Sequence, residues 1–186
     1  LHQVLWATSA AWFDYDRDGW LDLVVANYLE YDPARPCSDP AGERDFCGPV
    51  GFPGSVTKLY RNLGKSVGRG IRFEDVTGTS GLGGATGPGL GVVSEDFNRD
   101  GWPDLLVSND GRPNHLWLNQ EGKRFREEGM LEGVAVNGLG QALANMGIAV
   151  GDLFGTGQLS VFMTHLSEET HGLWTRSPDG LLFEDT

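Results

Sequence analysis

The stretch FDYDRDGWLDLVVANY, residues 13–28, places a cluster of aspartates directly before an apolar run. Gly19 interrupts this cluster, which consists of Asp14, Asp16, Asp18 and Asp22. Carboxylates this close to one another repel, so the cluster predicts a bound cation that neutralises them. The apolar run is rich in β-branched residues, which favours a strand over a helix.

This pattern is the first of three copies along the chain. The loop and its strand recur as EDFNRDGWPDLLVSN from Glu95 and as GDLFGTGQLSVFMTH from Gly151. A second signature follows each copy, as LYRN, LWLN and LWTR, and successive second signatures begin 57 residues apart. A third signature then closes each copy, as FEDVT, FREE and FEDT. Three signatures that occur three times in one order indicate a repeat architecture.

Each repeat is predicted to form four short strands. In the second repeat we expect them over residues 89–94, 103–108, 115–119 and 124–128, where β-branched and aromatic residues lie between glycine turns. Four short antiparallel strands per repeat are typical of a β-propeller blade. A β-sandwich is the alternative, but a sandwich does not require the loop chemistry to repeat. The predicted fold class is therefore an all-β propeller.

The repeats divide the chain into three predicted blades, residues 1–78, 79–133 and 134–186. The first blade contains an insertion, residues 29–56, between its second and third strands. Propellers usually have about four to eight blades. The chain also begins at a first strand and ends after a fourth, in phase with the repeat. We therefore expect a segment of a larger propeller, or one that other blades or subunits complete.

Composition restricts the classes of partner. The 186 residues suffice for one domain with its own core, and the 28 glycines are roughly twice the usual share of about 7%. The formal net charge of −12 argues against nucleic acid as a partner, because nucleic acid is bound by basic surfaces. Since no apolar run reaches the roughly 18–20 residues of a membrane-spanning helix, we expect no membrane insertion.

The aspartate cluster has the spacing of a calcium loop. Its side chains occupy positions 1, 3, 5 and 9 of a D-x-D-x-D-G-x-x-D motif, and the backbone carbonyl of Trp20 at position 7 is a further predicted ligand. Calcium takes about six to eight oxygens at relaxed geometry, whereas magnesium requires a stricter octahedron. Softer metals prefer Cys or His, which the loop lacks. A solvated acidic turn without metal is the alternative.

The second and third copies of the loop differ from the first in their ligands. The predicted ligands of the second copy are Asp96, Asn98, Asp100, the backbone carbonyl of Trp102, and Asp104. Because Asn98 removes one charge, we expect weaker calcium binding there. The third copy keeps only Asp152, since Phe154, Thr156 and Ser160 replace the other side-chain ligands. This degenerate loop is expected to bind metal weakly or not at all, with its two glycines forming the turn unaided.

The two cysteines of the chain, Cys37 and Cys47, lie within the insertion. They lack the accompanying His or second Cys pair of a zinc site. We favour a disulfide that closes this loop, which would place the protein in an oxidising compartment. The alternative is two free thiols in a surface loop.

The quoted motifs resemble known families. AAWFDYDRDGWLDLVVANY, GVVSEDFNRDGWPDLLVSND and GIAVGDL resemble FG-GAP/VCBS-type repeats, as found in the propeller of integrin α subunits. LYRNLG…RFEDVTGTSGL, NHLWLNQEGKRFREE and THLSEETHGLW…FEDT, with the Cys-bearing insertion, are more narrowly similar to the ASPIC/UnbV (cartilage acidic protein-like) group. The resemblance implies calcium-stabilised propellers that are secreted, periplasmic or on the cell surface, bind partners, and carry no catalytic residue set. The loss of ligands in the third loop and the low blade count depart from it.

The order of the strands predicts where a partner binds. The calcium loops join first and second strands, so the insertion and the loops between blades are expected on the opposite face. Variable loops on a rigid scaffold usually carry binding, and we expect a protein or glycan partner on that face. The five tryptophans at recurring positions are interpreted as packing between blades rather than as sugar platforms; they are Trp12, Trp20, Trp102, Trp117 and Trp174.

Catalysis is not expected from this sequence. A catalytic or transition-metal site is one interpretation of a histidine and glutamate cluster on the partner face. No orienting motif accompanies this cluster, so polar loop residues are the preferred interpretation. Its members are His115, His165, His171, Glu168 and Glu169. The chain also lacks a G-x-S-x-G elbow and a P-loop. The alternative function is the scaffold part of a propeller enzyme acting on polysaccharide, with its catalytic residues in other blades.

Overall fold

The computed structural model describes residues 5–66, 70–166, 169–176 and 183–185. Within these residues the chain forms three four-stranded antiparallel sheets and a two-stranded one, and none of them closes into a barrel. The helical content there consists of two short 3₁₀ turns, η1 (Pro49–Gly51) and η2 (Leu82–Gly84). No helix in this described part has the length and apolarity that a membrane crossing requires.

The three larger sheets are meanders, in which the strands of each sheet pair in their order along the chain. The first sheet consists of β1 (Ala7–Phe13), β2 (Asp22–Asn27), β4 (Lys58–Ser66) and β5 (Gly70–Asp75). The second consists of β7 (Gly89–Glu95), β8 (Asp104–Asn109), β9 (His115–Asn119) and β10 (Phe125–Glu127). The third consists of β11 (Ile148–Gly151), β12 (Ser160–Met163), β13 (Gly172–Arg176) and β14 (Phe183–Asp185). The four strands predicted for the second repeat are confirmed, with ends that differ by one residue at most.

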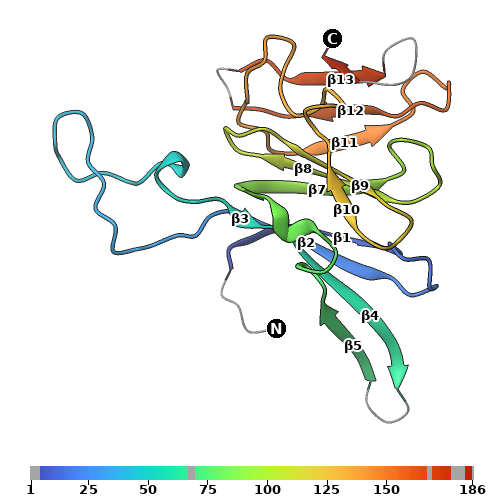
Figure 1. Cartoon of the computed structure of the whole chain (residues 1–186). Coiled ribbons are helices and arrows are strands. Elements are labelled where there is room, and N and C mark those ends of the chain that lie inside the picture. The colour runs from blue at the N-terminus through green and yellow to red at the C-terminus, as the bar shows by residue number, and fades with distance from the viewer. Residues whose placement is uncertain (1–4, 67–69, 167–168, 177–182, 186) are drawn as a thin grey trace.

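Figure 1 shows the second sheet lying between the first and the third. Every residue of β8 is buried, because this sheet is covered on both faces. Successive side chains of a strand point to opposite faces. Accordingly, Leu105 and Val107 pack toward the first sheet, and Leu106 packs toward the third.

Two apolar clusters join the sheets in pairs. The first cluster includes Phe13, Val24 and Leu59 of the first sheet and Leu105 and Trp117 of the second. The second includes Leu106 and Leu116 of the second sheet and Val161, Met163 and Trp174 of the third. The prediction that tryptophans pack between repeats is therefore confirmed for Trp117 and Trp174.

The outer faces of the first and third sheets are exposed. Trp12 follows the same alternation as its neighbours in β1, but it points away from the second sheet and is 57% exposed. It packs against Phe73 of its own sheet, so the inter-blade role predicted for it is not seen among the described residues. Phe162 of β12 lies on the opposite end of the stack and is 39% exposed. Both outer faces thus present apolar side chains to solvent.

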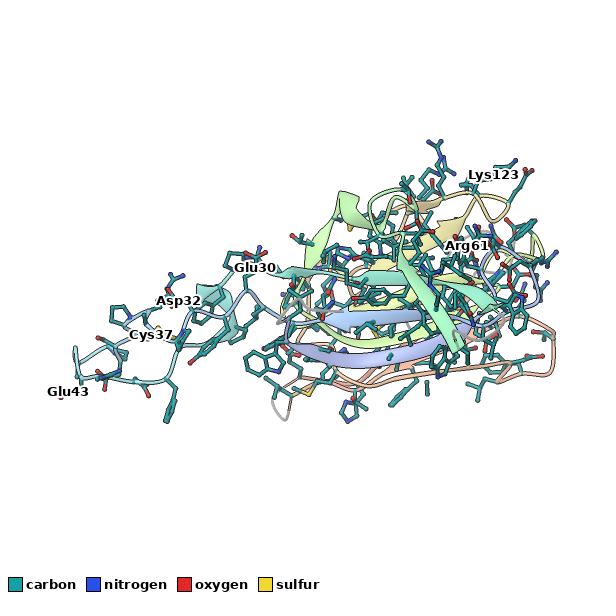
Figure 2. All side chains as sticks on the ribbon, turned by 90° about the horizontal axis from the view of Figure 1, so that it is seen from below. Glu30, Asp32, Cys37, Glu43, Arg61 and Lys123 are labelled. Carbon is teal, nitrogen blue, oxygen red and sulfur yellow. A yellow bond between two sulfur atoms is a disulfide. The ribbon has the colours of Figure 1, made fainter. Side chains whose placement is uncertain are left out.

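The insertion extends away from the sheets. Its stem is held by a bridge between Leu29 and Gly54 and by β3 (Ser55–Val56), which pairs with β6 (Thr86–Gly87). Figure 2 shows the rest of the insertion, including Cys37 and Glu43, at the end of the molecule opposite to Arg61. Cys37 and Cys47 form a disulfide that closes this loop, as the sequence analysis favoured.

Candidate metal centres

The loop between β1 and β2 brings three carboxylates together. Asp14, Asp16 and Asp18 each offer one oxygen, and these oxygens lie within 4.8 Å of one another. Among the described residues, this is the one group of three or more Asp, Glu, His or Cys side chains with such spacing. A set of oxygens from alternating carboxylates suits a hard cation such as calcium better than a soft one.

The backbone of this loop is fixed by its first aspartate. The carboxylate of Asp14 accepts hydrogen bonds from the backbone N–H of Asp18 at 3.1 Å and of Gly19 at 2.9 Å. Arg17 and Gly19 adopt left-handed conformations, with φ of 58° and 87°. Glycine is the residue that enters this region without steric cost, which explains its place after the third aspartate.

The second loop, between β7 and β8, repeats this geometry. The Asp96 carboxylate accepts a hydrogen bond from the N–H of Gly101 at 2.8 Å, and Arg99 and Gly101 have φ of 63° and 88°. The other carboxylate oxygen of Asp96, Oδ1, is buried and has no hydrogen-bond partner among the described residues. A buried carboxylate oxygen without a partner is costly, and a bound cation would satisfy it. The donor set of the second loop therefore also fits a calcium ion.

The aspartates at position 9 are placed differently from the others. Asp22 is fully buried, and its carboxylate accepts hydrogen bonds from the N–H of Tyr15 at 3.2 Å and of Asn62 at 2.7 Å. It does not belong to the group of three oxygens formed by the first loop. Desolvation raises the pKa of Asp22 to about 6, although both backbone bonds lower it. Asp22 thus ties the start of β2 to the loop before it and to β4 beside it.

Asp104 has the same role in the second sheet. Its carboxylate accepts hydrogen bonds from the N–H of Phe97 at 2.9 Å and of Asn119 at 2.8 Å. Desolvation raises the pKa of Asp104 to about 7. Each carboxylate oxygen has two lone pairs, so these bonds leave acceptor capacity for a cation beside the loop.

The tryptophans at position 7 connect each loop to its surroundings. The backbone N–H of Trp20 donates to the carboxylate of Asp18 at 2.9 Å, and the backbone N–H of Trp102 donates to the carboxylate of Asp100 at 2.8 Å. The indole of Trp20 lies against the backbone of Gly64 in its own sheet. The indole of Trp102 receives the guanidinium of Arg17 at 4.5 Å from its ring centroid, so the first loop contacts the second.

The third loop keeps the backbone turn of the first loop but lacks its carboxylates at positions 3, 5 and 9. Asp152 accepts hydrogen bonds from the N–H of Thr156 at 3.0 Å and of Gly157 at 2.6 Å, which are the counterparts of the bonds to Asp14. Gly155 and Gly157 have φ of 66° and 76°, so the left-handed positions are also retained. The two predicted glycines thus form the turn, and Asp152 adds hydrogen bonds to it that the sequence did not predict.

Arg61 contacts the first loop and was not among the residues predicted for the site. It lies on β4 and forms an ion pair with Asp16 at 2.7 Å and a longer one with Asp18 at 3.4 Å. It belongs to the LYRN signature, whose counterparts in the other repeats have Leu118 and Thr175 at this place. The sequence shows that this position differs between the three copies. That the arginine pairs with the loop carboxylates follows only from the position of β4 beside the loop.

On the opposite side of the sheets, His165 and His171 take part in hydrogen bonds, and the described residues there form no metal-ligand group. His165 is buried, with Nε2 at 2.7 Å from Asn145 Oδ1 and Nδ1 at 2.6 Å from the carbonyl of Thr170. The ring of His171 accepts the backbone N–H of His165. His115 lies apart, against Trp117. Glu169 accepts the N–H of Ala144, whereas Glu168 lies outside the described residues.

The sequence matches the family model of the FG-GAP-like repeat over residues 96–163. The match begins at the first aspartate of the second loop and ends with β12. No curated protein matches the chain significantly. An FG-GAP-like repeat is consistent with the sheets being propeller-type blades.

Proposed function

We propose that this chain is a three-blade segment of an extracytoplasmic β-propeller of the ASPIC/UnbV (cartilage acidic protein-like) group. In this proposal it binds calcium at the first two loops and binds a protein or glycan partner through the face opposite to them. Its role is interaction or structure, without catalysis. The observation that carries the proposal is the convergence of the carboxylates of Asp14, Asp16 and Asp18 in a loop whose backbone is already fixed.

Calcium would be held by oxygens of the first two loops. In the first loop the ligands are the three convergent carboxylates, with Asp22 and the Trp20 carbonyl as further candidates. In the second loop Asp96, Asn98 and Asp100 occupy the same positions, again with the carbonyl of Trp102 and Asp104. When bound, the ion supplies positive charge that offsets the repulsion among these carboxylates and clamps the hairpin between first and second strands.

Two further features support the setting and the assembly. The disulfide between Cys37 and Cys47 is typical of an oxidising compartment, which supports a secreted, periplasmic or cell-surface location. Trp12 and Phe162 lie on the two outer faces of the stack and are exposed. The middle sheet, in contrast, is covered on both of its faces. We therefore infer that other blades or subunits cover these faces and close the propeller.

Thermal unfolding with calcium and with chelator tests the metal assignment. Calcium should raise the melting temperature of the wild-type chain, because an ion that binds the native state stabilises it by mass action. Asp18→Ala and Asp100→Ala should each remove part of this increase, and both together should abolish it. Asp32→Ala, a carboxylate lost from the insertion, is the matched control and should keep the full increase. A wild-type melting temperature that does not respond to calcium would refute the proposal.

A glycan array tests the proposed partner face. A variant in which a short Gly-Ser linker replaces residues 34–50 keeps the stem, where Leu29 pairs with Gly54. If the partner is a glycan, this variant should lose the array signals of the wild-type chain. Lys123→Ala, at the end of the molecule that bears Arg61 (Figure 2), should retain them. Signals that survive the deletion would place the partner elsewhere.

A further inference from the structure

The differences between the two proposed calcium sites include a pair of charge-changing exchanges that occur together. Where the first loop has Asp16, the second has Asn98, and where β4 has Arg61, β9 has Leu118. In the first site the two exchanged residues contact each other, since the guanidinium of Arg61 lies 2.7 Å from Asp16 Oδ2. In the second site neither of the two replacing side chains is charged. The extra carboxylate of the first loop is therefore accompanied by its own counter-charge.

The exchanges leave the two sites with the same formal charge. The first has four aspartates and one arginine, which give −3, and the second has three aspartates, which also give −3. Among the described residues, Arg61 supplies the ion pairs to these carboxylates, and the second loop receives none. Two other cations lie close to the second loop. Arg17 stacks on the Trp102 ring, and Arg176 donates to the carbonyl of Phe97 while its charge is paired with Glu132.

We propose that Arg61 sets the calcium affinity of the first loop by cancelling the charge of Asp16, so that both loops bind calcium with similar affinity. This inference rests on the calcium binding proposed above, and it replaces the expectation that the second loop binds more weakly. The alternative is that Arg61 only orients the two carboxylates, as outer-shell partners of metal ligands do. The two roles have opposite consequences, because removing a counter-charge strengthens cation binding and removing a positioning residue weakens it.

Arg61→Leu separates these roles without threatening the fold. Leucine already occupies this place in the second sheet, at Leu118, and the Arg61 side chain is 40% exposed. Calorimetric titration with CaCl₂ in an Asp100→Ala background isolates the first loop. There, Arg61→Leu should bind calcium on the order of thirtyfold more tightly, which is the effect of one unit charge on a divalent ion at about 4 Å in water. Asp16→Asn should bind about thirtyfold more weakly, by the same Coulomb argument.

The double variant Asp16→Asn with Arg61→Leu tests compensation directly. It reproduces the charge of the second site and its side chains at these two places, so its affinity should return to within roughly twofold of the background. Arg44→Leu removes the same charge from the insertion and is the matched control, expected to leave the affinity unchanged. Circular dichroism of each variant in chelator checks that the fold is retained.

A reciprocal variant keeps the test independent of the Asp100→Ala background. In an Asp18→Ala background, Asn98→Asp adds a carboxylate that no arginine accompanies, and the second loop should bind calcium on the order of thirtyfold more tightly. Weaker or unchanged binding in Arg61→Leu would overturn the role of Arg61. Absence of calcium binding in the wild-type chain would instead refute the proposed function itself, so the two failures are distinguishable.

Discussion

The first and third loops have the same backbone but different side chains. In both, the aspartate at position 1 accepts two backbone N–H bonds, from Asp18 and Gly19 in one and from Thr156 and Gly157 in the other. Both also place residues with positive φ at positions 4 and 6. The third loop achieves this without a carboxylate at positions 3, 5 or 9. The turn therefore requires its first aspartate and its glycine, and little else.

This comparison separates the aspartates of the first loop by role. The presence of Asp14 needs no metal to explain it, because Asp152 accepts the same two backbone hydrogen bonds in the third loop. Asp16 and Asp18 are in excess of what the turn requires, and their proximity costs repulsion unless a cation offsets it. Arg61 offsets part of that charge. The remaining charge is the physical reason to expect an ion in the first loop and none in the third.

Asp22→Ala should have the largest effect on stability, since Asp22 is buried and accepts two buried backbone hydrogen bonds, whereas Asp16 forms a partly exposed ion pair. The substitution leaves the buried N–H groups of Tyr15 and Asn62 without an acceptor. Each unsatisfied buried group costs about 1–3 kcal/mol, so we expect unfolding free energy to fall by about 3 kcal/mol in urea titrations with chelator. Asp16→Ala is the control, and loss of its partly exposed ion pair should cost about 1 kcal/mol or less. Equal effects of the two substitutions would contradict this division of roles.

The sequence predicted the all-β class and the strands of the second repeat well because the relevant signals are local. Alternation of apolar residues and glycine turns located the strands of the second repeat, and D-x-D-x-D-G spacing located the loops. The pairing of Cys37 with Cys47 was also anticipated, because no other cysteine was present to compete.

Features that depend on neighbouring strands were not predicted. Asp22 was read as a metal ligand, and its bonds to Tyr15 and Asn62 become visible only when β4 lies beside the loop. The ion pair of Arg61 depends on the same register. The prediction for Trp12 was packing between blades, but its side chain lies on the face of the first sheet that points away from the second sheet. Strand alternation predicts that a side chain lies on one face of a sheet, but it does not say whether another sheet covers that face.

Restoring carboxylates to the third loop sharpens the comparison most directly. Phe154→Asp with Thr156→Asp recreates positions 3 and 5 on a backbone that Asp152 already holds in shape. Both side chains are exposed, so the substitutions should cost little stability. Calorimetric titration should then detect a further, weak calcium equivalent, because Ser160 leaves position 9 without a charge.

The matched control places the same two charges on an exposed surface outside the loop. Val50→Asp with Phe46→Asp adds them to the insertion, where both side chains are largely exposed, and should add no calcium equivalent. A third loop that gains the carboxylates yet binds no more calcium than this control would show that the shared backbone is insufficient. Ligands beyond positions 1, 3 and 5 would then have to distinguish the first loop from the third. Adding Ser160→Asp to the variant would test that directly, because it supplies the position that Asp22 occupies in the first loop.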